Sequence, residues 1–181
     1  FVNTIFEYDG IHGVDEWGET ETKSTYSRYT YDYYEKNGDD FRNIGSDISC
    51  EKYDAAYVNW GRDWCMPTLK QLQELLDNTT SVWTTQNNVN GRVFTGSNGG
   101  KIFLPAAGSK GYDYGASNWE VSNEVERGSY WSATVDEKGG YSAFACCLHF
   151  YSEATKIITN GNIHSGNSRY MGLSVRPVRT K

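Results

Sequence analysis

The sequence predicts one α+β domain over residues 1–181, in which two early helices precede a majority of short strands and loops. The chain has 181 residues, of which 38% are hydrophobic, and six Trp and 14 Tyr supply much of a modest core. The 19 Gly and only three Pro indicate many turns. The third observation is a β-hairpin pattern between Gly128 and Tyr151.

The hairpin pattern consists of two runs rich in aromatic and β-branched residues, separated by a turn at residues 136–140 with paired glycines. Side chains of the second run alternate between two faces. One face is expected to be core and comprises Phe144, Cys146, Leu148 and Phe150. The other face is mixed and suits a surface that touches a ligand; it comprises Tyr141, Ala143, Ala145, Cys147, His149 and Tyr151. A half-exposed sheet face without a ligand explains the same pattern.

Two segments have helical patterns. Residues Tyr53–Trp60 predict a short helix, because Ala56 and Trp60 fall on one face. The clearest helix begins at Thr68, which is expected to be its N-cap, and Gln71 completes a capping box. Leucines at positions 69, 72, 75 and 76 form one apolar stripe of this helix, which we assign to the core.

The rest of the chain is expected to form strands and loops. Residues 1–9 fit an edge strand, and residues 10–49 fit an ordered excursion pinned by aromatic side chains. Residues 83–100 are turn-rich, with turns at Asn90-Gly91 and at residues 98–100 on either side of a strand at 92–95. Further strands are predicted at 101–104, 156–159 and 172–178, the last with Leu173 and Val175 inward, and loops at 109–127 and 160–169.

Charge and hydropathy exclude several classes of protein. The net charge of −6 argues against a nucleic-acid binder, which needs a basic stripe. No apolar run is long enough to span a bilayer, so no membrane insertion is expected. The chain opens abruptly at Phe1 without a signal peptide, as a processed fragment of a longer exported protein would. Asp39, Asp40 and Asp47 lack the spacing of a calcium loop and are interpreted as a solvated face.

The four cysteines fit no metal-binding spacing, and neither a metal nor another cofactor is predicted. Cys146 and Cys147 are neighbours on a predicted strand and point to opposite faces. Cys50 and Cys65 are compatible with a disulfide in an exported protein, but their spacing does not fix the pairing.

Several motifs, in order along the chain, resemble one known family. They are WGETETKSTY from Trp17, DAAYVNWGRDWCMPT from Asp54, WTTQNNVNGRVFTGSNGGKIFLPAAG from Trp83, YWSAT from Tyr130 and GLSVRPV from Gly172. Together they resemble the Fibrobacter succinogenes major paralogous domain, which is common in exported proteins of gut bacteria. The resemblance covers most of the chain, from about residue 17 to residue 178.

The resemblance implies a C-type-lectin-like fold related to that of the formylglycine-generating enzyme, with two helices, small antiparallel sheets and long ordered loops. It also implies a ligand-binding module of a bacterial surface or pilus tip. Some relatives are variable proteins of diversity-generating retroelements, whose C-terminal segment is hypermutated. The chain departs from the family at Cys65, where arginine is usual, and in residues 1–10, which lack the usual opening strand motif. It also lacks the EPN- and WND-type triplets of calcium lectins, so calcium-dependent sugar chelation is not expected.

Composition and resemblance together favour a non-catalytic adhesin or receptor-binding domain at the cell surface, with a protein or glycan of another cell as its partner. Tyr and Trp offer large contact areas at low entropy cost, while Ser, Gly and Asn give adaptable hydrogen bonds. The candidate ligand-binding residues lie on the mixed hairpin face and in two loops: Tyr112, Tyr114, Asn118, Trp119, Tyr141, His149, Tyr151, Asn160, Asn162, His164, Asn167 and Tyr170. Adenine-targeted mutation of Asn codons yields many of these residue types, which fits a diversified segment between residues 111 and 170.

Two alternatives stay open. An enzyme of the formylglycine-generating type would need a reactive cysteine pair, whereas Cys146 and Cys147 face opposite ways. Cys147 beside His149 is a weak candidate for a nucleophile and its base. A structural pilus or surface-layer subunit would polymerise through an edge strand, against which Pro177 argues mildly. Arg176 is interpreted as a scaffold residue held by carbonyls or a carboxylate, outside the ligand site.

Overall fold

The computed structural model describes residues 46–113, 118–136, 144–158 and 171–180, with the backbone alone for 110–113, 118–121, 136 and 156–158. This part of the chain is α+β, as the sequence predicts. The elements are α2 (Ala55–Trp60), β1 (Trp64–Cys65), α3 (Leu69–Asp77), β2 (Thr79–Gln86), β3 (Val89–Gly96), β4 (Lys101–Pro105), β5 (Ala107–Asp113), β6 (Asn118–Glu124), β7 (Arg127–Asp136), β8 (Phe144–Tyr151), β9 (Thr155–Ile158) and β10 (Val178–Arg179).

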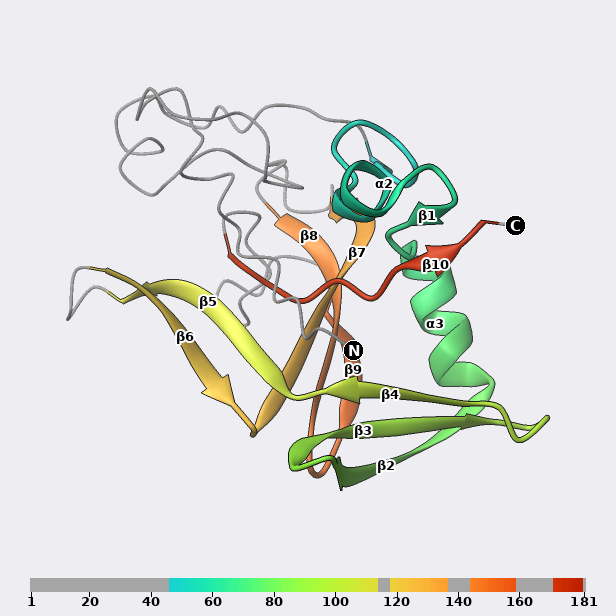
Figure 1. Cartoon of the computed structure of the whole chain (residues 1–181), viewed down its shortest axis with the longest axis vertical. Coiled ribbons are helices and arrows are strands. Elements are labelled where there is room, and N and C mark those ends of the chain that lie inside the picture. The colour runs from blue at the N-terminus through green and yellow to red at the C-terminus, as the bar shows by residue number, and fades with distance from the viewer. Residues whose placement is uncertain (1–45, 114–117, 137–143, 159–170, 181) are drawn as a thin grey trace.

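The strands form three small sheets. A two-stranded sheet pairs β1 with β10, a three-stranded sheet has the order β2-β3-β4, and a five-stranded sheet has the order β6-β5-β7-β8-β9. Neighbouring strands are antiparallel except β5 and β7, which meet in parallel at Gly108 and Gly128. In Figure 1 the three-stranded sheet lies at one end of the β7–β8 pair and α2 at the other, while the β5–β6 hairpin projects to the side.

Helix α3 confirms the predicted capping box. The Thr68 hydroxyl accepts a hydrogen bond from the Gln71 backbone N–H at 3.2 Å, and the Gln71 side chain accepts one from the Thr68 N–H at 2.9 Å. Leu72 is buried, and Leu75 and Leu76 pack against the same cluster. The leucine stripe therefore anchors α3 to the sheets, as predicted.

Helix α2 begins at Ala55, two residues later than predicted, because Asp54 is its N-cap. The Asp54 side chain is fully buried and accepts four backbone N–H groups. One carboxylate oxygen accepts from Ala56 and Tyr57, and the other from Cys50 and Met66, each at 2.8–3.1 Å. Burial raises the pKa of Asp54 above its ordinary value, although each of the four N–H groups lowers it.

A disulfide joins Cys50 to Cys65, with 4.9 Å between their Cα atoms. It settles the pairing that the sequence left open. The bond links the same two segments that Asp54 links through the Cys50 and Met66 N–H groups. The turn before α2 is therefore fastened to β1 by one covalent bond and one buried carboxylate.

The central hairpin is confirmed as the antiparallel pair β7–β8, while its turn at 137–143 lies outside the described residues. The prediction of an exposed mixed face was wrong for Ala145, Cys147 and His149, whereas Tyr151 is half-exposed and Tyr141 and Ala143 lie outside the described residues. Ala145 and Cys147 are fully buried against Ile48, Met66 and Leu173, and His149 is only 8% exposed. The other face is buried too, with Leu148 and Phe150 in a second cluster. Strand β8 is thus covered on both sides by segments remote in sequence.

Phe150 organises this second cluster. Its ring stacks on Tyr130 with centroids 5.9 Å apart and meets Phe94 and Trp83 edge-on, each at 6.3 Å. A Cβ atom at Gly128 would collide with the Phe150 ring. Glycine is therefore needed at the start of β7 so that this ring can lie flat against the strand.

Three further predictions need correction. Asn90 and Gly91 form no turn but lie inside β3; the hairpin turns at Asn87 and Asn88, both with positive φ. Residues 109–127, predicted as a loop, include most of strands β5 and β6. The segment 172–178 has Leu173 and Val175 buried as predicted, but pairs with β7 only through Ser174.

The outer side of β7 is completed by remote segments. The N–H groups of Trp131, Ala133 and Val135 donate to the carbonyls of Ser174, Pro67 and Ser46, at 2.7–2.9 Å. The N–H of Ile48 in turn donates to the Ala133 carbonyl at 3.0 Å. Beyond residue 128, these three separate segments take the place of a continuous neighbouring strand.

Candidate functional site

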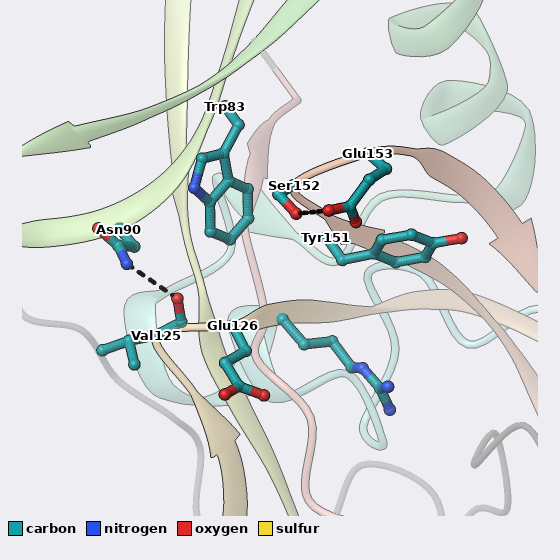
Figure 2. Close-up of a pocket in the computed structure, with 8 residues that line it drawn as sticks. Trp83, Asn90, Val125, Glu126, Tyr151, Ser152 and Glu153 are labelled. Atoms are coloured by element: carbon teal, nitrogen blue, oxygen red, sulfur yellow. Dashed lines mark hydrogen bonds between the residues drawn. The ribbon is translucent and has the colours of Figure 1, made fainter.

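An open cleft of about 470 Å³ lies where the three-stranded sheet meets two turns of the five-stranded sheet. Figure 2 shows the Trp83 ring between Asn90 and Ser152, with Val125 and Glu126 of one turn below it. The cleft is lined by Trp83, Asn90, Val125, Glu126, Arg127, Tyr151, Ser152 and Glu153.

The β6–β7 turn forms one wall and is fixed by Asn90. The Asn90 side-chain N–H donates to the Val125 carbonyl at 3.0 Å, and its carbonyl oxygen accepts from the Thr85 hydroxyl at 2.7 Å. The Val125 N–H donates to the Ala106 carbonyl at 2.9 Å. These bonds hold Val125 at a φ of 62°, a conformation that β-branched residues rarely adopt. Its side chain is 56% exposed at the cleft rim.

The β8–β9 turn forms the other wall and is fixed by Arg92. The guanidinium donates to the Tyr151 carbonyl at 2.8 Å and to the Ser152 carbonyl at 3.1 Å. On its own sheet it donates to the Ser81 hydroxyl at 2.9 Å. Burial lowers the pKa of Arg92, but an arginine stays protonated.

Asn90 and Arg92 stand two residues apart on β3 and so face the same side of the strand. Each reaches across to a different turn of the five-stranded sheet. The two walls of the cleft are therefore tied to one strand, which fixes their separation.

Two aromatic residues, Trp83 and Tyr151, line the cleft. Trp83 lies opposite Arg92 in the β2–β3 pair and is half-buried, with its ring edge-on to Phe150. Tyr151 ends β8, opposite Arg127 on β7, and its ring meets the His149 imidazole edge-on at 6.2 Å. Trp83 packs against the cluster around Phe150, and Tyr151 is half-buried, so part of each side chain stays accessible.

Charged side chains line the rim. Glu126, Arg127 and Glu153 are exposed, and the Ser152 hydroxyl donates to the Glu153 carboxylate. That hydrogen bond lowers the pKa of Glu153, so the carboxylate is ionised at neutral pH. The cleft thus combines aromatic faces with charged groups of both signs, a surface suited to binding.

The predicted site residues divide into three groups. Tyr151 lines the cleft, whereas the prediction that His149 is at a surface was wrong: its Nδ1 lies 3.0 Å from the buried Ser129 hydroxyl. The register places Tyr112 opposite Trp119, next to Asn118, at the far end of the β5–β6 hairpin. The remaining predicted residues lie outside the described ranges: Tyr114, Tyr141, Asn160, Asn162, His164, Asn167 and Tyr170.

The pair considered for the enzyme alternative lies in the core. Cys147 is 1% exposed, and His149 faces Ser129 across the β7–β8 pair. The described residues contain no group of three or more His, Cys, Asp or Glu side chains that could hold a metal ion. None of the residues that line the cleft is a cysteine or histidine.

A second hollow, of about 430 Å³ and mostly apolar, lies between α3, β4 and residues 176–178. Its buried wall includes Tyr130, whose hydroxyl donates to the Pro105 carbonyl at 2.8 Å. Burial raises the pKa of Tyr130, and the positive charge of Arg176 opposes this shift. Arg176 lines this hollow and is absent from the lining of the cleft.

Sequence reasoning missed most of the cleft. Trp83 and the residues around it were assigned to a turn-rich region, although TTSVWTTQ at 79–86 has the β-branched and aromatic content of a strand. Glu126 and Arg127 were placed at the end of a loop. Arg92 was assigned to a strand, but no local signal identifies a side chain whose partners are 59 and 60 residues away.

Comparisons with known proteins add no relative. No family model, no curated protein and no solved structure matches this chain. None of the helices in the described ranges is long and apolar enough to cross a membrane.

Proposed function

We propose that this chain is a non-catalytic ligand-binding domain, an adhesin or receptor-binding module of a bacterial surface or pilus-tip protein. The observation that carries the proposal is the cleft, in which Trp83 and Tyr151 are held between two turns fixed by Asn90 and Arg92. Half-buried aromatic residues beside polar groups are frequent in ligand-binding surfaces.

Rigidity supports a binding role. The Arg92 guanidinium spans both sheets, and the Asn90 amide uses donor and acceptor at once. A site that is already in its bound shape loses less conformational entropy when it takes a ligand. The strained Val125 at the rim fits the tendency of backbone strain to gather at ligand sites.

We further propose that the domain has a C-type-lectin-like fold and belongs to the family that its motifs resemble. Two helices and small sheets in the described residues are in keeping with that fold. A place at the cell surface, a glycan or protein partner, and diversification of the C-terminal segment come with this proposal. The disulfide suits a protein that folds in an oxidising compartment.

The test is binding of the purified chain to a glycan array and to a panel of host and bacterial surface proteins, with and without EDTA. Binding that Trp83→Ala and Tyr151→Ala abolish, but that EDTA leaves intact, would support calcium-independent recognition in the cleft. Trp64→Ala is the matched control, because Trp64 is 36% exposed on β1, away from the cleft lining. Binding that survives both cleft variants would show that the ligand site lies elsewhere.

A further inference from the structure

We infer that the cleft receives an arginine side chain presented by a protein partner. This inference rests on the proposed binding function and specifies the ligand's chemistry. The side chains of the cleft that form no internal hydrogen bond with Asn90 or Arg92 are free to contact a ligand.

The internal hydrogen bonds engage the polar side chains of Asn90 and Arg92. Both ends of the Asn90 amide are engaged, by Thr85 and by the Val125 carbonyl. The Arg92 guanidinium donates to Ser81 and to the carbonyls of the β8–β9 turn. These groups shape the cleft, and recognition falls to the exposed side chains at its rim.

Two of those rim side chains are carboxylates. Glu126 and Glu153 are both exposed, and neither forms an ion pair with a basic side chain in the described part of the chain. Arg127 is the exposed basic residue of the lining, so two carboxylates stand against one guanidinium. The chain as a whole carries a net charge of −6, which favours encounter with a cationic partner.

Arginine fits this combination better than lysine or a neutral group. Its planar guanidinium can stack on an aromatic ring and at the same time donate two parallel hydrogen bonds to a carboxylate. Trp83 supplies an aromatic face, and Glu126 and Glu153 lie on the two turns near it, while the Tyr151 ring points away from Trp83 (Figure 2). The ligand's guanidinium would thus meet a stacking surface and a carboxylate that forms no ion pair with the described residues, within one cleft.

The test uses a pair of probes of nearly the same shape, one cationic and one neutral. The ¹⁵N-labelled full chain is titrated with N-acetyl-arginine amide and with N-acetyl-citrulline amide, its neutral analogue. The Trp83 indole N–H signal, assigned through Trp83→Phe, reports binding in the cleft. We expect the arginine probe to bind about fivefold to tenfold more tightly than the citrulline probe, as a stacked, ion-paired cation would.

Charge variants give the sign of the effect. The double variant E126Q/E153Q is expected to remove the preference for arginine, while R127Q is expected to increase arginine affinity about twofold. Both changes affect exposed side chains of similar size, so the fold should be retained.

Other outcomes separate the two proposals. Equal binding of both probes, or no shift with arginine while a glycan or neutral peptide binds in the cleft, would overturn the arginine inference and leave the binding function standing. If no array ligand and neither probe depends on Trp83 or Tyr151, the binding function fails and this inference fails with it.

Discussion

Replacing Asp54 with asparagine tests how the buried carboxylate stabilises the fold. In the native protein its two oxygens accept four N–H groups, two from the first turn of α2 and two from Cys50 and Met66. An asparagine has one acceptor oxygen. Whichever way its amide turns, its NH₂ group faces a pair of N–H donors.

The magnitude follows from that pair. Asparagine is as good an N-cap as aspartate. We therefore expect its oxygen to accept from the Ala56 and Tyr57 N–H groups and the Cys50 and Met66 N–H groups to lose their acceptor. Each buried N–H without an acceptor costs about 1–3 kcal/mol. Because the Cys50 N–H is only partly buried, D54N should lower the free energy of unfolding by about 2–4 kcal/mol.

Urea unfolding followed by tryptophan fluorescence measures this change, with the slope m checked for constancy. The control is D63N, the same chemical change at an exposed position, which should stay within about 0.5 kcal/mol of wild type. A D54N loss below about 1 kcal/mol would refute the reasoning, since it would mean that the two N–H groups find other acceptors or water.

Acidification adds a second test of the same residue. Burial raises the pKa of Asp54, so the folded state binds this proton more tightly than the unfolded chain does. The resulting stabilisation is complete below the ordinary pKa of 3.8 and is lost as pH rises through the folded-state pKa. The stability gap between wild type and D54N should therefore widen on acidification. A gap that narrows would mean that the four N–H donors outweigh burial.

Three other perturbations test the disulfide and the cleft. C50A/C65A should lower the free energy of unfolding by about 3 kcal/mol in thermal melts under oxidising conditions, because the bond spans 15 residues; an unchanged melting temperature would contradict this. R92K keeps the charge, but a lysine cannot donate to Ser81, Tyr151 and Ser152 together. Hydrogen exchange of the Tyr151 N–H, which donates to the Ala154 carbonyl, should therefore become about tenfold faster. The control variant R127K should leave this exchange rate unchanged. V125G should raise stability by about 1 kcal/mol by relieving the strain at φ 62°, whereas V125A should not; equal effects would show that the backbone there is unstrained.

Local patterns in the sequence predicted what local physics decides. The capping box at Thr68 and the leucine stripe of α3 depend on residues within two turns of each other, and both are present. The Asn90-Gly91 pair was misleading because it matches a common hairpin turn. Glycine is needed at 91 for another reason: a Cβ there would collide with the Leu104 carbonyl and the Phe103 ring of the neighbouring strand.

Long-range packing decided what the sequence could not. Alternation along β8 predicted one exposed face, but the small side chains of Ala145 and Cys147 allow Ile48 and Met66 to cover it. The cleft likewise joins Trp83 to Tyr151, and only the Tyr151 end was predicted. Composition predicted that aromatic side chains form a ligand-binding surface, and this stays a prediction; it gave no indication that Trp83 and Tyr151 line one cleft.

The separate segments that pair with the outer side of β7 have a consequence for how the molecule folds. Three segments far apart in the chain, around residues 46, 67 and 174, must all pack against β7 before the N–H groups on this side of the strand have acceptors. Such non-local closure is slow, on the order of milliseconds to seconds for small β-rich domains. During synthesis, part of one side of β7 would lack its hydrogen-bond partners until residue 174 has left the ribosome. In that interval the strand can pair with another copy, so yield on refolding should fall as protein concentration rises.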